Sequence, residues 1–327
     1  MKKALYLLVA LAVAFTAFSC KPNTPDRVPE DNTEENKDPE ENKDPEEENK
    51  EPEKLTVKTC ADNLVLHISF DNDNLLEVGE GLTFNSSKGD ANISEGYIGK
   101  GWRNKSGNNS KPAYSKFDVA SGSLFSKIDD VTFTAWIKNT EEYPKGGIIS
   151  LNGSGIDFPA FLVYLDNTYT DAETGVKMQQ VNGRLVFHDE KGNEQNLWLD
   201  TSDEAFTKYG QWFQLGFTYK TNVPWKGEDG EQPEKPVGKL FLYVDGIMVA
   251  ERTFEPNIVF NNLVTANTNA FYVGGWSTYI EGQSTQSWQN YWSGSIDEVR
   301  LYNKALTEDE MLALYKEEVN INLSQED

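Results

Sequence analysis

Few side chains in this chain have a spacing that suits catalysis. A retaining glycosidase needs two carboxyl groups about 5 to 5.5 Å apart, and residues two apart on one β-strand come within roughly that distance. The acidic residues 189–190 and 308–310 stand instead at an expected turn and an expected helix start. Neither His67 nor His188 has a serine or cysteine nucleophile motif beside it. The sequence therefore predicts that the protein is not an enzyme.

A polar loop rich in aromatic residues is the best candidate for ligand binding. Residues 275–292 contain three tryptophans and two tyrosines among serine, threonine, glutamine and asparagine. Sugar rings stack their C–H faces on aromatic rings, and polar side chains bind the hydroxyl groups. The alternative is that Trp276 and Trp292 close the edge of the fold as apolar plugs. The ligand-binding candidates are Trp276, Tyr279, Trp288 and Asn290 in this loop, and Trp225 in a separate charged loop.

The pattern of apolar residues after residue 55 is typical of β-strands. In residues 64–71 large apolar side chains occupy every second position, which favours a strand with one buried face. Residues 239–250 place the pair Asp245 and Gly246 between two such runs, as in a hairpin with a two-residue turn. Similar strand patterns occur at residues 131–137, 147–151, 161–165, 184–188, 212–219 and 271–274. We expect Trp102, Trp136, Trp198 and Trp212 to lie in the core or against a sheet.

The end of the chain combines an irregular strand with one capped helix. Residues 292–302 break the two-residue period at Asp297, because Val299 and Leu301 are in phase with Asp297 and Ile296 is not. Such a break predicts a bulge or a bound ion. Thr307 and residue 310, a glutamate, have the spacing of a capping box at a helix start. Many strands and a single late helix indicate a β-sandwich.

Several of these segments, in this order, resemble the LamG-like family. The similar segments are Val-Thr-Phe-Thr-Ala-Trp-Ile at 131–137, Gly-Gln-Trp-Phe at 210–213, Leu-Tyr-Val-Asp-Gly at 242–246 and Trp-Ser-Gly-Ser-Ile-Asp-Glu-Val-Arg-Leu-Tyr at 292–302. The resemblance covers most of residues 60–316. It implies an all-β, two-sheet antiparallel jelly-roll sandwich of the concanavalin A-like type with one short C-terminal helix. Since that fold carries lectins, adhesion modules and glycosidases, it does not decide the function.

The same resemblance implies a possible metal site. Sandwiches of this superfamily often hold calcium where the first and last strands meet, and Asp71 and Asp297 belong to those strands. Calcium takes six to eight oxygen ligands, so the two aspartates would need backbone carbonyls and water. Two interpretations stay open. Either a structural calcium ion (Ca²⁺) binds both residues, or Asp71 caps a turn while Asp297 pairs with Arg300 or another cation.

The N-terminal part of the chain predicts export and membrane attachment. Residues 1–20 have two lysines followed by an apolar run, as in a secretory signal, and end in Ala-Phe-Ser-Cys, which resembles a bacterial lipobox. This resemblance implies lipidation of Cys20. Residues 21–54 carry 14 acidic and 6 basic residues with very few apolar ones, which predicts a disordered tether. The sandwich domain would then occupy residues 55–327.

Charge and organisation together suggest the class of partner. A net charge of −23 without a basic stripe argues against nucleic acid as a partner. We therefore expect a non-catalytic glycan-binding lipoprotein of the bacterial outer membrane, on the cell surface or the periplasmic face. A protein-binding adhesion module is the first alternative, and a divergent glycoside hydrolase is the second. The sequence leaves the glycan, the partner and the oligomeric state open.

Overall fold

The computed structural model describes residues 56–140, 145–153, 158–170, 177–188, 194–201, 209–286 and 289–325, with the backbone alone at 167–170, 177–178 and 188. These residues belong to the second of two compact units, Lys54–Asp327. The predicted signal segment with Cys20 and the predicted tether lie outside the described residues.

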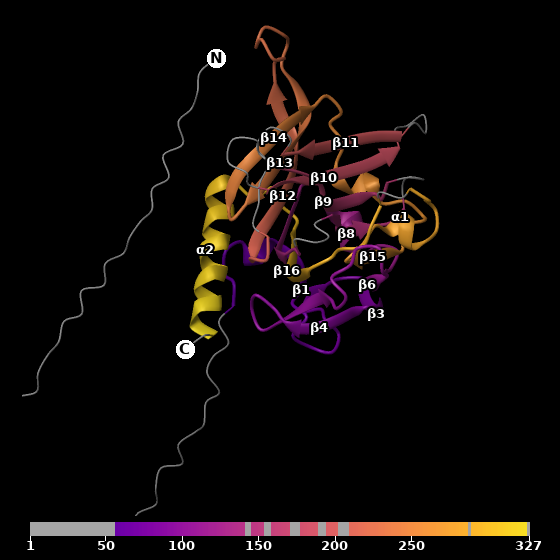
Figure 1. The fold of residues 1–327 in the computed structure, drawn as a ribbon. Helices are drawn as coiled ribbons and strands as arrows, with labels where there is room; N and C mark the ends of the chain where they lie inside the picture. Colours follow the sequence, from indigo (N-terminus) through magenta and orange to yellow (C-terminus); the bar gives the residue numbers. More distant parts are fainter. Residues whose placement is uncertain are drawn as a thin grey trace, which may run out of the picture. The chain divides into compact units, whose positions relative to one another are not determined.

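Two antiparallel sheets make up the described part of the chain (Figure 1). Sheet A follows the order β14 (Ile247–Phe254), β13 (Lys235–Val244), β12 (Phe213–Trp225), β7 (Val131–Lys138), β16 (Ser295–Tyr302), β1 (Leu64–Ile68) and β2 (Val78–Gly79), with β5 (Lys100–Asn104) beside β16 and β4 (Ala91–Glu95) beside β5. Sheet B follows the order β11 (Glu194–Asp200), β10 (Lys177–His188), β9 (Phe161–Thr170), β8 (Gly146–Leu151), β15 (Ala270–Val273), β6 (Ala113–Val119) and β3 (Leu82–Gly89). The architecture is the all-β sandwich that the sequence predicts.

Three 3₁₀ helices and two α-helices complete the described fold. The 3₁₀ helices are η1 (Ala61–Asn63), η2 (Leu124–Lys127) and η3 (Phe260–Leu263), and the α-helices are α1 (Ser277–Ile280) and α2 (Glu308–Gln325). No helix among the described residues is long and apolar enough to cross a membrane.

The core fills the space between the two sheets. Inward side chains of β7, β12 and β16 in sheet A meet those of β9 in sheet B, as when the ring of Phe133 lies 6.2 Å from that of Phe161. Phe161 in turn lies 5.5 Å from Phe217. All three rings are buried. Alternation along each strand therefore leaves every second side chain on an outer face, where a ligand could reach it.

The predicted hairpin between β13 and β14 is confirmed. Its turn residues Asp245 and Gly246 have φ angles of 50° and 75°. Both are the positive values that a two-residue turn of this type requires. The turn joins Val244 directly to Ile247 across the ladder.

The predicted irregularity in the last strand is a β-bulge. The pairing of β16 with β7 shifts register between Asp297 and Arg300, and Glu298 has a φ of 51°. Because of the extra residue, the side chains of Ile296 and Val299 both face the core. The side chains of Asp297 and Glu298, between them, both face the outer side of the sheet. The bulge thus places two carboxylates and then a guanidinium on the outer face of sheet A.

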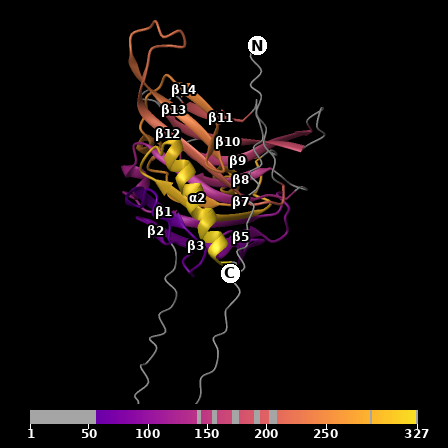
Figure 2. The ribbon, with the colours of Figure 1, turned by 90° about the vertical axis from the view of Figure 1, so that its left-hand side faces the viewer.

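Helix α2 covers that outer face, as Figure 2 shows. At its start, the backbone N–H of Glu310 donates to the Thr307 hydroxyl over 3.3 Å and the N–H of Thr307 donates to the Glu310 carboxylate over 3.0 Å. This is the predicted capping box. The helix has 18 residues, so the expectation of a short helix is wrong. It extends because Met311, Leu314 and Ile321 find apolar cover on sheet A.

Candidate functional site

The aromatic loop before β16 turns out to be largely a packing element. Trp276 is 2% exposed and packs with Leu162 and Tyr164 on the outer face of sheet B, 4.7 Å from the Tyr164 ring. Trp292 is fully buried in the main core. Because a buried ring offers no free face to a sugar, Trp276 has the plugging role that was the alternative, and it is corrected from a ligand-binding candidate to a structural residue.

The other predicted ligand-binding residues lie apart from one another. Tyr279, in α1, and Asn290 are half-buried, and the Tyr279 ring meets the Tyr291 ring edge-on at 5.6 Å. Trp288 lies outside the described residues. Trp225 is half-buried at the end of β12, with the Lys235 ammonium 5.1 Å from its ring. Their ligand-binding roles stay predictions.

The outer face of sheet B carries a cluster that the sequence analysis did not single out. On β11, Leu197 and Leu199 point into the core, so Trp198 between them points outward and is 39% exposed. Trp198 pairs across the ladder with Arg184 of β10, and one guanidinium N–H of Arg184 donates to the Tyr164 hydroxyl over 3.4 Å. The alternation in residues 196–200 was the available signal. It was missed because every tryptophan near a strand was assigned to packing.

Three buried polar atoms beside Trp198 have no hydrogen-bond partner among the described residues. They are Asn182 Nδ2 and Arg184 Nε, two residues apart on β10, and Asn196 Oδ1 on β11. The side chain of Asn182 is 6% exposed. A buried polar atom without a partner is costly, and a bound molecule or water removes that cost. This surface, formed by Tyr164, Asn182, Arg184, Asn196 and Trp198, is called the Trp198 face below.

The structure brings the two predicted metal-binding aspartates to one turn. Asp297 is fully buried and accepts backbone hydrogen bonds from Tyr97 and Ile98 over 2.8 and 2.9 Å. Its other oxygen accepts the N–H of Glu298 over 2.8 Å. Asp71 accepts the backbone N–H of Lys100, at the other end of the turn, over 2.8 Å. The two carboxylates therefore hold the 96–100 turn from both sides.

The hydrogen bonds of Asp297 limit what it could offer to calcium. Three N–H groups occupy three of the roughly four lone-pair sites of its carboxylate, so at most one site on Oδ1 is left for a cation. The calcium site stays a prediction. No group of three or more acidic, histidine or cysteine side chains suited to a metal occurs within the described ranges. Burial raises the pKa of Asp297 well above its usual value, and the Glu298 charge raises it further, while the three N–H donors oppose both. Asp297 also makes no ion pair with Arg300, the alternative expectation, since Arg300 pairs elsewhere.

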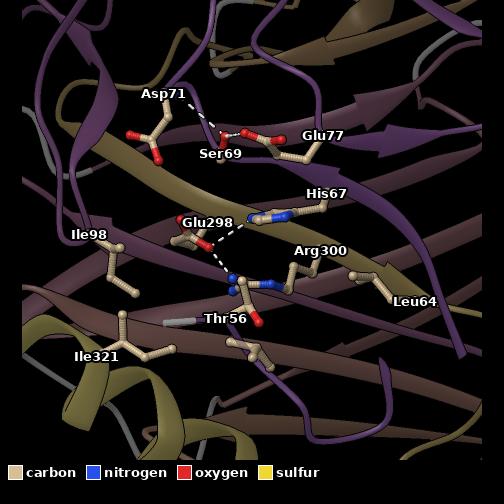
Figure 3. A pocket seen from close by; sticks show the side chains of 11 residues that line it. Thr56, Leu64, His67, Ser69, Asp71, Glu77, Ile98, Glu298, Arg300 and Ile321 are labelled. Atoms are coloured by element: carbon tan, nitrogen blue, oxygen red, sulfur yellow. Dashed lines mark hydrogen bonds and ion pairs between the residues drawn. The ribbon is translucent and has the colours of Figure 1, made fainter. Parts of the chain in front are cut away.

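A cavity of about 290 Å³ lies between β1, β16 and α2 (Figure 3). His67 and Glu298 meet there, with His67 Nε2 2.8 Å from Glu298 Oε2. Arg300 donates to the same Glu298 oxygen. Ile98 and Ile321 line the opposite wall. No local sequence pattern reveals this cluster, because His67 and Glu298 are 231 positions apart and only the strand register and the bulge bring them together.

The polar cluster continues under α2 and has a structural role. Arg300 donates to Glu318 of α2 with a second nitrogen, and the Trp136 indole N–H donates to Glu318 over 2.7 Å. Gln214 donates to the same Glu318 carboxylate. Every carboxylate of this chain of contacts thus faces a cation or an N–H donor. The arrangement attaches α2 to sheet A.

Comparison with known families agrees with this fold. Residues 111–311 match the model of the Laminin G type described as the concanavalin A-like lectin/glucanases superfamily. The chain belongs to this superfamily. A comparison with curated proteins found no match.

Similar solved structures include two kinds of carbohydrate-related proteins. Domain 4 of AbnA, an extracellular arabinanase of Geobacillus stearothermophilus solved with arabinotriose, is 18% identical with a TM-score of 0.41, covering 77% of this superfamily member and 98% of that domain. The botulinum neurotoxin serotype D ligand-binding domain, solved with N-acetylneuraminic acid, is 12% identical with a TM-score of 0.45. The type G receptor-binding domain is 14% identical with a TM-score of 0.46. The protein covers about half of each toxin domain, 51%.

Proposed function

We propose that the protein is a non-catalytic carbohydrate-binding lipoprotein whose glycan site is the Trp198 face. The observation that carries this proposal is an exposed indole beside three buried polar atoms without partners. The Arg252 guanidinium lies over one side of the Trp198 ring, 4.4 Å from its centre, so the other side of the indole would offer the flat apolar surface to a sugar ring. The unpaired atoms offer hydrogen bonds to its hydroxyl groups.

The chemistry of the unpaired atoms favours a polyhydroxylated ligand. Asn182 Nδ2 and Arg184 Nε are donors, whereas Asn196 Oδ1 is an acceptor. A hydroxyl group both donates and accepts, so neighbouring hydroxyls on one sugar can satisfy both kinds of atom. An aromatic platform with a few fixed polar groups is how proteins orient such ligands. A protein partner, the alternative, would have to place separate donors and acceptors within the same few ångströms.

Membrane attachment is proposed from the sequence alone. The segment Ala-Phe-Ser-Cys at residues 17–20 resembles a lipobox, and residues 21–54 would form a tether between a lipidated Cys20 and the sandwich domain.

The test is binding by the chain from residue 21 onward, which keeps every described residue. A glycan array identifies ligands, and calorimetry measures affinity for the wild type and two variants. Trp198→Ala should weaken binding by about 1 to 3 kcal/mol, the range for a stacked ring removed from an aromatic platform. Tyr315→Ala, which removes a half-buried aromatic ring on helix α2, is the control and should leave affinity unchanged.

Other outcomes would contradict the proposal. If Trp198→Ala and the wild type bound the array ligand with equal affinity, the Trp198 face would not be the glycan site. Release of shortened sugars from an array ligand would show a glycosidase. Binding to surface proteins that persists after enzymatic removal of their glycans would favour the adhesion alternative.

A further inference from the structure

A second cavity, of about 500 Å³, lies on the outer side of sheet A near the start of β16. It is unlike the Trp198 face, because cations and glycine backbone line it. We call it the Arg103–Lys138 pocket. Its lining includes Glu95, Arg103, Lys138, Asn139, Trp212 and Gly294.

Two cations flank a serine on the floor of this pocket. Ser295 of β16 pairs with Arg103 of β5 on one side and with Lys138 of β7 on the other. Residues paired across a ladder point to the same face, and the adjoining row that contains Ile296 points into the core. The row of Arg103, Ser295 and Lys138 therefore faces outward. Two strand spacings separate the backbones of the two cations by about 10 Å.

The floor is held rigidly. Asn104 is buried, its side-chain amide donates to the carbonyl of Trp292 over 2.8 Å, and its backbone N–H donates to the carbonyl of Gly294 over 3.0 Å. A Cβ at Gly294 would lie 1.9 Å from the carbonyl oxygen of Lys138, so only glycine allows this approach. The base of the site is thus formed before any ligand arrives, which lowers the entropy cost of binding.

One wall depends on Asp297. By accepting the N–H groups of Tyr97 and Ile98, Asp297 fixes the turn that carries the Tyr97 ring. That ring stacks on Trp136 at 3.5 Å and meets Trp212 edge-on at 6.1 Å. Trp212 directly precedes β12 and is half-buried, so part of its indole is left to line the pocket. The buried carboxylate of Asp297 thus positions an aromatic wall.

The side chain of Asn139 is not available to a ligand in this pocket. It is 2% exposed, and its Nδ2 donates to Gln179 of β10, in sheet B, over 2.7 Å. The pocket therefore offers a ligand chiefly its two cations and Trp212. No described carboxylate forms an ion pair with Arg103 or Lys138.

We propose that the Arg103–Lys138 pocket binds a single acidic sugar, a uronic acid residue. Its carboxylate would accept hydrogen bonds from Arg103 and Lys138, which are stronger than bonds between neutral groups. Its ring would contact Trp212. Glu95 at the rim and the net charge of −23 oppose a run of several anionic residues, so the pocket suits one carboxylate. The proposal extends carbohydrate binding to a second face and does not depend on the Trp198 face.

The test compares sugars that differ only in the carboxylate. The probes are the methyl glycosides of glucuronic and galacturonic acid, each against the corresponding glucose or galactose glycoside, in ligand-observed NMR titrations of the chain from residue 21 onward. We expect at least one uronide to bind about tenfold or more tightly than its neutral counterpart. Because the cations carry this preference, Arg103→Gln and Lys138→Gln should each remove most of it.

Two control variants and a salt series complete the experiment. Lys105→Gln removes a nearby cation that does not line the pocket and should keep the preference, and Glu95→Gln should keep or increase it. High salt should lower the affinity for the uronide and leave the affinity for the neutral sugar unchanged. Equal affinity for every uronide and its neutral partner, or a preference that survives in both Arg103→Gln and Lys138→Gln, would overturn the proposal. Melting temperatures show whether these variants remain folded.

The outcome is separable from that of the proposed glycan site. Trp198→Ala should abolish binding of the array ligand and leave the uronide preference intact. The variants at Arg103 and Lys138 should do the reverse. Failure at one face therefore leaves the result at the other face interpretable.

Discussion

Glu310 caps the start of helix α2 and makes the stability of the domain depend on pH. It accepts hydrogen bonds from the Thr307 backbone and from the Lys304 ammonium. Partial burial raises the pKa of Glu310, but these hydrogen bonds outweigh burial and lower the pKa to about 2. Because the folded-state pKa lies below the ordinary value of 4.5, the stabilisation is complete above about pH 4.5 and is lost as the pH falls towards 2.

Glu310→Gln should therefore cost stability in a pH-dependent way. At pH 6 we expect a loss of about 0.2 to 1 kcal/mol in the free energy of unfolding, the range for a partly exposed ion pair, because glutamine keeps the capping box. The difference from wild type should narrow as the pH falls below 4.5. Urea unfolding at several pH values measures it, and Glu308→Gln in the same turn is the control. A difference that stays constant down to pH 2 would mean that the carboxylate charge is not the cause.

Asp297 is the residue at which the structure limits the calcium hypothesis. Since its oxygens accept three backbone N–H groups, Asp297→Asn should destabilise the domain by about 1 to 3 kcal/mol, because an amide N–H₂ would face one of these donors. The melting temperature of the wild type should be the same in calcium and in a chelator. If the chelator lowered it, and Asp297→Asn removed that effect, calcium would be a ligand after all.

At the scale of elements, helix α2 is attached by a buried ion pair as well as by apolar contacts. Arg300 and Glu318 are 3% and 0% exposed. Glu318→Leu leaves Arg300 paired with Glu298, but it leaves the buried N–H donors of Trp136 and Gln214 without their acceptor. Each unsatisfied buried donor costs about 1 to 3 kcal/mol, so Glu318→Leu should destabilise the domain by about 2 to 6 kcal/mol in guanidinium unfolding. The double variant Arg300→Met with Glu318→Leu should not recover this loss, because it also removes the cation that pairs with the buried Glu298.

A neighbouring carboxylate provides the control for this prediction. Glu317 accepts backbone hydrogen bonds from Lys58 and Thr59 over 2.8 and 2.9 Å and is not in the buried cluster. Glu317→Leu should cost at most about 1 to 2 kcal/mol, as for a hydrogen bond to a charged group. If Glu317→Leu and Glu318→Leu were equally damaging, the buried hydrogen bonds to Glu318 would not be the cause.

Element prediction from the sequence worked where a pattern is local. The period of two, the Asp245–Gly246 pair and the Thr307–Glu310 spacing each depend on a few consecutive residues. The length of α2 was underestimated because its outward residues are polar and its burial comes from sheet A. The helix propensity of these residues does not reflect the contacts that the helix makes with sheet A.

At the scale of the whole molecule, the two outer faces have different roles. Sheet A carries α2 and the first described residues, while sheet B carries the Trp198 face. We expect mass spectrometry of the mature protein to show an acylated N-terminal Cys20, and Cys20→Ala to release the protein from membranes. Lys21→Ala, which keeps the cysteine, should stay attached. A mature chain that begins elsewhere without a lipid would exclude the anchor.

The sequence by itself determined the class of fold and the position of a bulge, because alternation and its interruption at Asp297 are properties of consecutive residues. It did not determine which side chains form a site. In the sequence Trp276 stands among polar residues and Trp198 stands between two leucines, yet Trp276 is covered by Leu162 and Tyr164 while Trp198 remains exposed. Likewise, only strand pairing places Arg103 beside Ser295 and Lys138. Which face of a sheet stays open is decided by the segments that pack on it, and those contacts join residues far apart in the chain.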